Sequence, residues 1–331
     1  MDSMRAWAAH DAGRLELETK PVPNPGHGEV LVEVLTCGVC RTDLHVVDQE
    51  LPVHHPGVTP GHQIVGRVVE LGGGVTRVAE GDLVGIAWLR HTCGICRWCR
   101  SGRENLCPAS RYTGWDDDGG YAELAIAEEA YLYTLPPDSD PVATAPLLCA
   151  GIIGYRALSR ANLPDGGNLG LYGFGSSAHI TAQIAMAAGA QIFVMTRGEK
   201  SRQLARSMGA TFVGGEAEMP PSPLDSAIIF APAGNLVPPA LKATTRGGTV
   251  SLAGIHMTDL PPLVYEDDLF YERDLRTVTA NTRADGEALL RVALALKVAP
   301  EVTTYPFDQV DHALDDLRAG GMSGSLVIQV K

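Results

Sequence analysis

The stretch that most limits how this chain can fold is residues 169–179, LGLYGFGSSAH. An apolar run ends in a glycine turn, and apolar residues at helical spacing follow, which is the pattern of a strand, a tight turn and a helix. Gly173 permits the turn, Gly175 lets backbone approach a pyrophosphate, and Ala178 lets the helix pack closely on the strand. The helix N-terminus then offers free N–H groups to an anion. Such turns are common, so the stretch by itself favours a nucleotide site without requiring one.

The sequence after this stretch continues the alternation of strand and helix. Apolar strand patterns are predicted at 192–195, 225–230, 248–254 and 275–279, and a helix at 200–208. Alternation of this kind predicts an α/β domain with a parallel, doubly wound sheet.

Length and charge narrow the class of protein further. The chain has 331 residues, enough for two domains, and 26 Lys and Arg against 39 Asp and Glu give a net charge of −13. An acidic surface argues against nucleic acid or an anionic membrane as the main partner. No apolar run reaches the length of a membrane span, and the first residues lack the features of a signal peptide, so we expect a cytoplasmic protein.

Four of the seven cysteines stand close together, at Cys93, Cys96, Cys99 and Cys107. The spacing Cys-x2-Cys-x2-Cys-x7-Cys brings four thiolates to one point within a lobe of about residues 90–110. Four sulfurs fill a tetrahedral zinc site and leave no open position, which is typical of a structural metal. Four thiolates can also hold an iron–sulfur cluster.

A second group of metal-binding residue types lies in two turns, CGVCRTDLH at 37–45 and GHQ at 61–63. Thiolate and imidazole are ligands that zinc accepts readily. Asp43 is suited to orient a ligating imidazole through a hydrogen bond. The plainer interpretation is two ordinary turns with a buried thiol and a surface histidine.

The Gly-Val-Cys-Arg-Thr-Asp-Leu-His stretch followed by Gly-His resembles the zinc-dependent medium-chain alcohol dehydrogenases. That resemblance implies that Cys40 and His62 bind a catalytic zinc and that Cys149 supplies the third ligand, with the fourth position open. It implies that Thr42 and His45 relay the substrate proton by way of the cofactor ribose, and that Arg41 contacts the cofactor pyrophosphate. It also favours zinc over iron–sulfur in the four-cysteine lobe.

Two further positions are interpreted through the same resemblance. The family usually has Glu after the Gly-His histidine, and this chain has Gln63, which keeps the shape but loses a charge behind the metal. Trp88 resembles a residue that lines the substrate pocket, although core packing explains a tryptophan there equally well. Cys37 has no role in the family and is interpreted as a small core residue.

The end of the second predicted strand suggests which dinucleotide is bound. An acidic residue normally stands there for the adenosine ribose, and this chain has Thr196, then Arg197 and Lys200. We therefore expect NADP(H) to be favoured over NAD(H). The alternative is that both cations are solvated at a helix start and that NAD serves without the acid. The full set expected at the cofactor is Arg41, Gly173, Gly175, Ser176, Ser177, Thr196, Arg197 and Lys200.

The resemblance covers essentially the whole chain and implies its domain organisation. We expect a mostly-β, GroES-like catalytic domain at 1–145, a Rossmann cofactor domain at 146–282, and a return to the catalytic domain at 283–331 through helices 285–297 and 310–318 and strand 324–330. The family forms dimers and tetramers, so a homodimer or homotetramer is expected.

The function that follows is reversible oxidation of alcohols to aldehydes or ketones, with two zinc ions per chain and a nicotinamide cofactor. Two alternatives remain open at this point. One is a reductase of the same superfamily that acts on quinones or activated alkenes. The other is a non-catalytic redox or zinc sensor on this fold, which the replacement of the family's usual glutamate by Gln63 would indicate.

Overall fold

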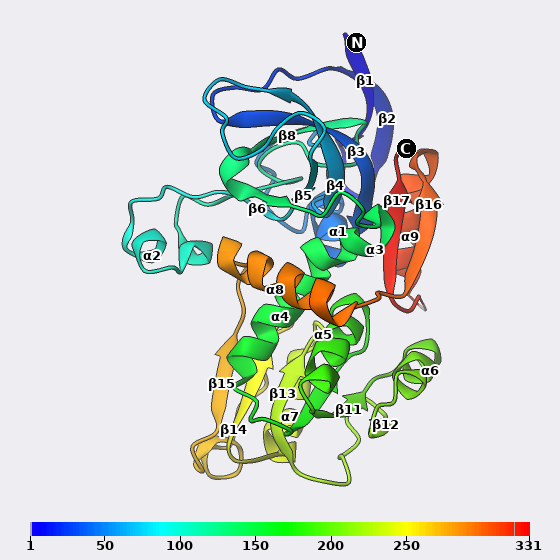
Figure 1. The fold of residues 1–331 in the computed structure, drawn as a ribbon. Coiled ribbons are helices and arrows are strands. Elements are labelled where there is room, and N and C mark those ends of the chain that lie inside the picture. Colours follow the sequence, from blue (N-terminus) through cyan, green and yellow to red (C-terminus); the bar gives the residue numbers. More distant parts are fainter. Residues whose placement is uncertain (1, 321) are drawn as a thin grey trace.

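The computed structural model describes residues 2–320 and 322–331. Two large sheets, each with its own core, are stacked one above the other, with helices α4 (Ala150–Ala161) and α8 (Arg283–Leu296) between them (Figure 1). A small lobe with the short helix α2 (Arg97–Arg100) projects from the side of the upper body.

The remaining elements have the following bounds. The strands are β1 (Ser3–Ala9), β2 (Leu15–Pro21), β3 (Glu29–Val39), β4 (Ile64–Leu71), β5 (Leu83–Ile86), β6 (Leu89–His91), β7 (Arg111–Tyr112), β8 (Leu124–Glu128), β9 (Leu132–Thr134), β10 (Asn168–Tyr172), β11 (Gln191–Met195), β12 (Phe212–Gly214), β13 (Leu224–Ile229), β14 (Thr244–Leu252), β15 (Asp274–Thr277), β16 (Val302–Pro306) and β17 (Ser325–Gln329). The helices are α1 (Arg41–Val47), α3 (Pro141–Thr144), α5 (Ser176–Ala187), α6 (Glu199–Ser207), α7 (Val237–Ala243) and α9 (Val310–Ala319), with short turns η1 (Glu104–Leu106), η2 (Glu129–Tyr131), η3 (Ala145–Leu148), η4 (Gly234–Leu236), η5 (Tyr265–Leu269) and η6 (Phe307–Gln309).

The lower sheet has six strands in the order β12-β11-β10-β13-β14-β15, all parallel. Its central strand β10 is apolar on both faces because helices cover both. Leu169 and Leu171 pack with alanines of α4, α5 and α6 on one face, and Tyr172 packs with α7 on the other. The prediction of a parallel, doubly wound sheet is confirmed.

The strand order reverses beside β10, between β11 and β13. Ligands of open α/β sheets bind at this point, beyond the carboxyl ends of the strands. The glycine turn follows β10 here, and Gly173 has φ +86°, a backbone conformation that L side chains rarely adopt. The turn therefore lies where a dinucleotide is expected.

The upper sheet has seven strands, with β16-β17-β3-β4-β5-β9 in order and β8 paired with β3. Two neighbouring strands of this sheet, β17 and β3, come from opposite ends of the sequence, and Leu326 of β17 pairs with Val39 of β3. In Figure 1, β16, β17 and α9 form the orange and red flank of the upper body. Helix α9 and strand β17 lie within a residue of the helix and strand expected at 310–318 and 324–330.

The segment 145–158, which leads from the upper sheet towards the lower one, is not one continuous helix. η3 ends at Leu148, α4 begins at Ala150, and Cys149 between them has the non-helical angles φ −132° and ψ −69°. Within the described residues no single helix is long and apolar enough to cross a membrane. The pair Pro141–Leu148 and Ala150–Ala161 reaches that length together but bends by 45°. Many of its apolar side chains, such as Leu148 and Ile152, are buried in the core.

The projecting lobe is attached to the chain just before α8. Glu104 of η1 is buried, and its carboxylate accepts hydrogen bonds from the Arg283 backbone N–H (2.9 Å), Nε (2.9 Å) and Nη2 (3.2 Å). Asn105 donates to the Thr279 carbonyl at 2.8 Å. Burial opposes ionisation of Glu104, but the bonds from Arg283 outweigh it, so the carboxyl pKa lies below its ordinary value.

Replacing Glu104 by glutamine is expected to lower the free energy of unfolding at pH 7 by about 2 kcal/mol, because hydrogen bonds to a charged group are lost. A carboxyl with a depressed folded pKa stabilises above its unfolded pKa, near 4.5, and that stabilisation disappears as the pH falls through the folded value. Denaturant unfolding at several pH values measures the difference between wild type and variant. This difference in unfolding free energy should become smaller as the pH is lowered. An equal difference at pH 3 and pH 7 would mean that the shape of the side chain, and not its charge, is responsible. Glu287→Gln, at an exposed position of α8, is the matched control.

Candidate functional site

Three of the predicted metal ligands meet at one point of the upper body. Cys40 stands at the end of β3 and caps α1, His62 lies in the turn before β4, and Cys149 occupies the break between η3 and α4. His62 Nε2 lies 3.3 Å from each of the two sulfurs, and all three ligand atoms lie within 4.8 Å of one another. The break before α4 is what brings Cys149 to the other two.

The surroundings of this three-residue group suit a cation. His62 is 1% exposed, and its other ring nitrogen, Nδ1, lies 3.1 Å from Asp43 Oδ1. Asp43 is itself held by the backbone N–H groups of Cys40 (2.8 Å) and Gly61 (3.2 Å). Burial by itself lowers the pKa of His62, but the charges of Cys40 and Asp43 outweigh it and raise the pKa to about 10. Two sulfurs and one imidazole, in a negative and buried setting, form a donor set that fits zinc.

Gln63 lies behind this group, buried against β3. A Cβ built on Gly38 would come within 2.8 Å of its amide carbon, so the side chain fills the space fully. Its Nε2 has no hydrogen-bond partner within the part of the chain that the structure describes. The side chain is thus accommodated by shape, and the charge that glutamate would supply is missing.

The two residues expected to move a proton lie on α1, three positions apart and so on one face of the helix. Thr42 is buried, and His45 is 13% exposed in its side chain. His45 Nδ1 is hydrogen-bonded to Glu50, and its ring centroid lies 5.4 Å from that of His256, in the loop after β14. The neighbouring Arg41 is exposed.

Glu50 and His256 were not found from the sequence. Glu50 follows α1 without any motif, and His256 comes to this place only because the lower sheet packs beneath the upper one. The contact of His256 with His45 shows that a loop of the lower body meets α1, the helix that Cys40 caps.

Trp88 lies directly against this group. Its ring meets the His62 ring edge to face, with centroids 4.8 Å apart and planes at 69°, and it stacks on Tyr112 at 4.9 Å and Trp115 at 5.9 Å. Trp88 is 8% exposed. It is therefore both a packed core residue and a neighbour of the proposed metal position, and the two interpretations from the sequence are compatible.

The four cysteines of the lobe converge as a second group. The sulfurs of Cys93 and Cys107 lie 3.5 Å apart, and those of Cys96 and Cys99 also lie 3.5 Å apart. The N–H groups of Ile95 and Cys96 lower the pKa of the Cys93 thiol to about 6, whereas burial raises the pKa of the Cys107 thiol to about 11. Four sulfurs within 4.8 Å of one another fit a closed tetrahedral site.

The glycine turn of the lower sheet has the shape expected for a phosphate site. A Cβ on Gly175 would meet nothing within 4 Å, so open space lies above the turn. Ser176 and Ser177 begin the twelve-residue helix α5, whose first N–H groups have no partners inside the helix. Ser176 Oγ also lies 2.6 Å from Ser325 Oγ at the start of β17, which links this turn to the upper sheet.

The predicted specificity residues follow β11 as expected, with one addition. Thr196 is buried at the strand end, while Arg197 and Lys200 are exposed. Arg197 Nε lies 3.0 Å from Glu216 Oε2, a carboxylate from the segment after β12. This ion pair could not be predicted from the sequence, because Glu216 comes to the end of β11 only through the pairing of β11 with β12.

Comparison with known proteins agrees with this arrangement. A family model described as "Alcohol dehydrogenase GroES-like domain" matches residues 26–137, and one described as "Zinc-binding dehydrogenase" matches residues 178–295. A probable alcohol dehydrogenase AdhA of Mycobacterium tuberculosis is 54% identical over 99% of this chain and 98% of its own length. The chain belongs to the zinc-type medium-chain dehydrogenase/reductase family. It is thus an oxidoreductase with the GroES-like and Rossmann domains of the zinc-type dehydrogenases.

Solved structures of zinc-type dehydrogenases superpose closely on the chain. A CAD protein from Helicobacter pylori, complexed with NADP(H), gives a TM-score of 0.92 at 25% identity and covers 99% of this chain and 98% of its own. A cobalt- and zinc-bound thermostable alcohol dehydrogenase from Pyrobaculum aerophilum gives 0.90 at 27% identity, with 99% and 100% covered.

Proposed function

We propose that this dehydrogenase interconverts alcohols with aldehydes or ketones by exchanging hydride with a nicotinamide dinucleotide, in a zinc-dependent reaction. The observation that carries the proposal is the meeting of Cys40, His62 and Cys149 at one point, next to a helix, α1, that contacts the lower body through His45 and His256. The relatives named as alcohol dehydrogenases support the same reaction.

The residues of the chain have separate tasks in this reaction. Cys40, His62 and Cys149 would hold the catalytic zinc, which when bound supplies a Lewis acid that polarises a substrate oxygen. Asp43 orients His62 through its Nδ1. Gly173–Gly175 and Ser176–Ser177 would hold the pyrophosphate of the dinucleotide, whose nicotinamide would supply the hydride chemistry.

Proton movement is assigned to α1. The Thr42 hydroxyl, buried on the same face as His45, would accept the proton of a substrate alcohol at Oγ1 while its own hydroxyl proton passes on towards His45. His45, partly exposed and hydrogen-bonded to Glu50, would exchange that proton with solvent at its ring. Trp88 would line the substrate pocket beside His62 with a flat aromatic wall.

The four cysteines Cys93, Cys96, Cys99 and Cys107 would hold a second, structural zinc in the lobe. The proposal further assigns residues 1–145 and 283–331 to the catalytic domain and 146–282 to the cofactor domain. A homodimer or homotetramer is expected, and sedimentation of the purified chain measures this directly.

A panel of alcohols, aldehydes, quinones and activated alkenes, assayed with both cofactors before and after metal chelation, tests the proposed reaction. We expect alcohol and carbonyl turnover that chelation abolishes, and two zinc ions per chain. Quinone or alkene turnover that survives chelation would instead indicate the reductase alternative. No hydride transfer to any member of the panel would indicate a sensor.

We propose that NADP(H) is preferred, because Thr196 stands where an acidic residue would bind the ribose diol and Arg197 follows it, although the Glu216 carboxylate pairs with that cation. Replacing Thr196 by aspartate is expected to lower the ratio of kcat/KM for NADPH over NADH about tenfold, since a carboxylate repels a ribose phosphate and binds a ribose diol. Steady-state kinetics with both cofactors measure the ratio. Thr196→Asn is the neutral control of similar size, and a wild type that prefers NADH would overturn the assignment.

A further inference from the structure

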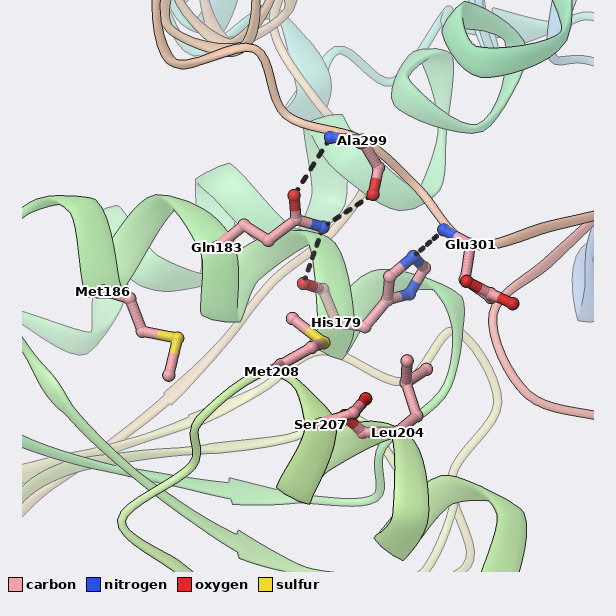
Figure 2. Close-up of a pocket in the computed structure, with 8 residues that line it drawn as sticks. All are labelled: His179, Gln183, Met186, Leu204, Ser207, Met208, Ala299 and Glu301. Atoms are coloured by element: carbon pink, nitrogen blue, oxygen red, sulfur yellow. Dashed lines mark hydrogen bonds between the residues drawn. The ribbon is translucent and has the colours of Figure 1, made fainter.

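Two polar side chains of α5 bind the backbone of residues 299–301, the segment that leads from α8 into β16. Gln183 makes a pair of bonds with one residue, donating from Nε2 to the Ala299 carbonyl (3.1 Å) and accepting at Oε1 from the Ala299 N–H (3.0 Å). One turn earlier, His179 accepts a hydrogen bond from the Glu301 N–H (3.1 Å). Figure 2 shows both side chains pointing from the helix towards this segment.

The contacts of His179 fix the state of its ring. The side chain is 1% exposed, Nε2 faces the Glu301 N–H, and Nδ1 lies 3.1 Å from the Gly175 carbonyl. A backbone N–H only donates and a carbonyl only accepts, so Nε2 must be the acceptor and Nδ1 must carry the proton. The ring is therefore neutral with a single tautomer. Burial also lowers its pKa, which agrees with the neutral form.

Gly175, the carbonyl partner of His179, is the second glycine of the turn after β10. It is exposed, and a Cβ there would meet no atom within 4 Å, so side-chain packing does not restrain this peptide. The bond from His179 Nδ1, together with the N–H of the same residue at 3.1 Å, holds the Gly175 carbonyl in one orientation. The next N–H groups, which would meet a pyrophosphate, are oriented along with it.

One imidazole thus connects the turn to the backbone that enters the other body. Glu301 immediately precedes β16, and β16 pairs with β17, which in turn pairs with β3 ahead of Cys40. We propose that His179 is a positioning residue for the dinucleotide, which ties the Gly173–Gly175 turn to the 299–301 segment and so to the sheet that carries Cys40. The proposal rests on the proposed function only in that a dinucleotide binds at this turn.

Gln183 provides a matched control for this role. It binds the same segment from the same helix, but it makes no bond to the turn. A merely structural contact would lower thermal stability in either variant and leave cofactor affinity unchanged. A positioning contact would affect cofactor affinity only when His179 is changed.

The test is the Kd of NADPH and NADH, measured by fluorescence on the zinc-loaded protein, together with Tm and metal content. His179→Ala is expected to raise the Kd of the preferred cofactor about five- to tenfold, the effect of one or two lost hydrogen bonds. Gln183→Ala is expected to lower Tm by about as much as His179→Ala does. It should change the Kd by less than about twofold, because Gln183 makes no bond to the turn. Equal Kd values for His179→Ala and the wild type would overturn the proposal.

Two polar variants separate the bonds and cover the case in which the alanine variant does not fold. Asparagine places an amide nitrogen near the position of Nδ1 and keeps the bond to Gly175, but it is too short to reach Glu301. Glutamine reaches Glu301 but not the carbonyl of the turn. Both are expected to bind the cofactor at least about threefold more weakly than the wild type. Full affinity in His179→Asn would show that the tie to residues 299–301 is irrelevant, whereas a wild type that binds neither dinucleotide would overturn the proposed function instead.

Discussion

Replacing Cys40 by alanine is expected to lower kcat/KM for alcohol oxidation by more than about a hundredfold, while the far-UV circular dichroism stays that of the wild type. Replacing a residue that only hydrogen-bonds to a metal ligand already lowers metal affinity or activity about ten- to a hundredfold. Loss of a direct ligand should have a larger effect. His62 would be left with one sulfur neighbour, Cys149, at 3.3 Å. Steady-state kinetics and metal analysis measure the effect, and the zinc content should fall from two ions per chain to one.

Cys37→Ala is the matched control, because Cys37 lies three residues earlier, at the same end of β3, and its buried sulfur belongs to neither cysteine group. It should keep both metals and nearly full turnover, with a stability loss of about 1 kcal/mol for the small cavity. Full turnover in Cys40→Ala would show that the catalytic site has been assigned to the wrong residues.

Replacing Cys107 by alanine is expected to give the largest loss of stability, on the order of 4 kcal/mol or more, because loss of a structural metal is among the most destabilising single changes. Cys107 is buried and its sulfur is within hydrogen-bonding distance of the Cys93 sulfur. The substitution therefore removes one of the four sulfurs that meet in the middle of the lobe. Metal content should fall by one ion, and limited proteolysis should cut the chain between residues 93 and 107.

Ser101→Ala in the same lobe is the control, since among the described residues the Ser101 hydroxyl bonds only to the Trp98 carbonyl. It should retain both metals and resist proteolysis. Two metals per chain in Cys107→Ala, with unchanged stability, would contradict a closed four-sulfur site.

The sequence predicted the parallel sheet well because its inner strands β10, β11 and β13 are mostly buried and so read as short apolar runs. β11 and β13 lie within one residue of their predicted bounds. β12 and β16 were not predicted, for a physical reason. β12 has three residues, and the side chains of β16 are half-buried or exposed, so neither shows the apolar pattern of a core strand.

The metal groups were visible in the sequence to different degrees. The lobe cysteines are close in the chain, so their spacing alone points to a metal. Cys149 is far from Cys40 and His62, and only the family resemblance suggested it, because the break before α4 has no marker of its own in the sequence. Glu50, His256, Glu216 and the bonds of His179 all depend on contacts between distant segments, which periodicity and spacing do not encode.

The pairing of β17 with β3 also has a consequence for how the protein is made. The whole six-stranded sheet is synthesised between these two partners, so it can fold while the edge of β3 that β17 will cover is still open. An open strand edge invites pairing with other chains. Nascent chains that stop short of residue 325 should therefore bind chaperones or aggregate through β3, even though their nucleotide-binding half is already folded.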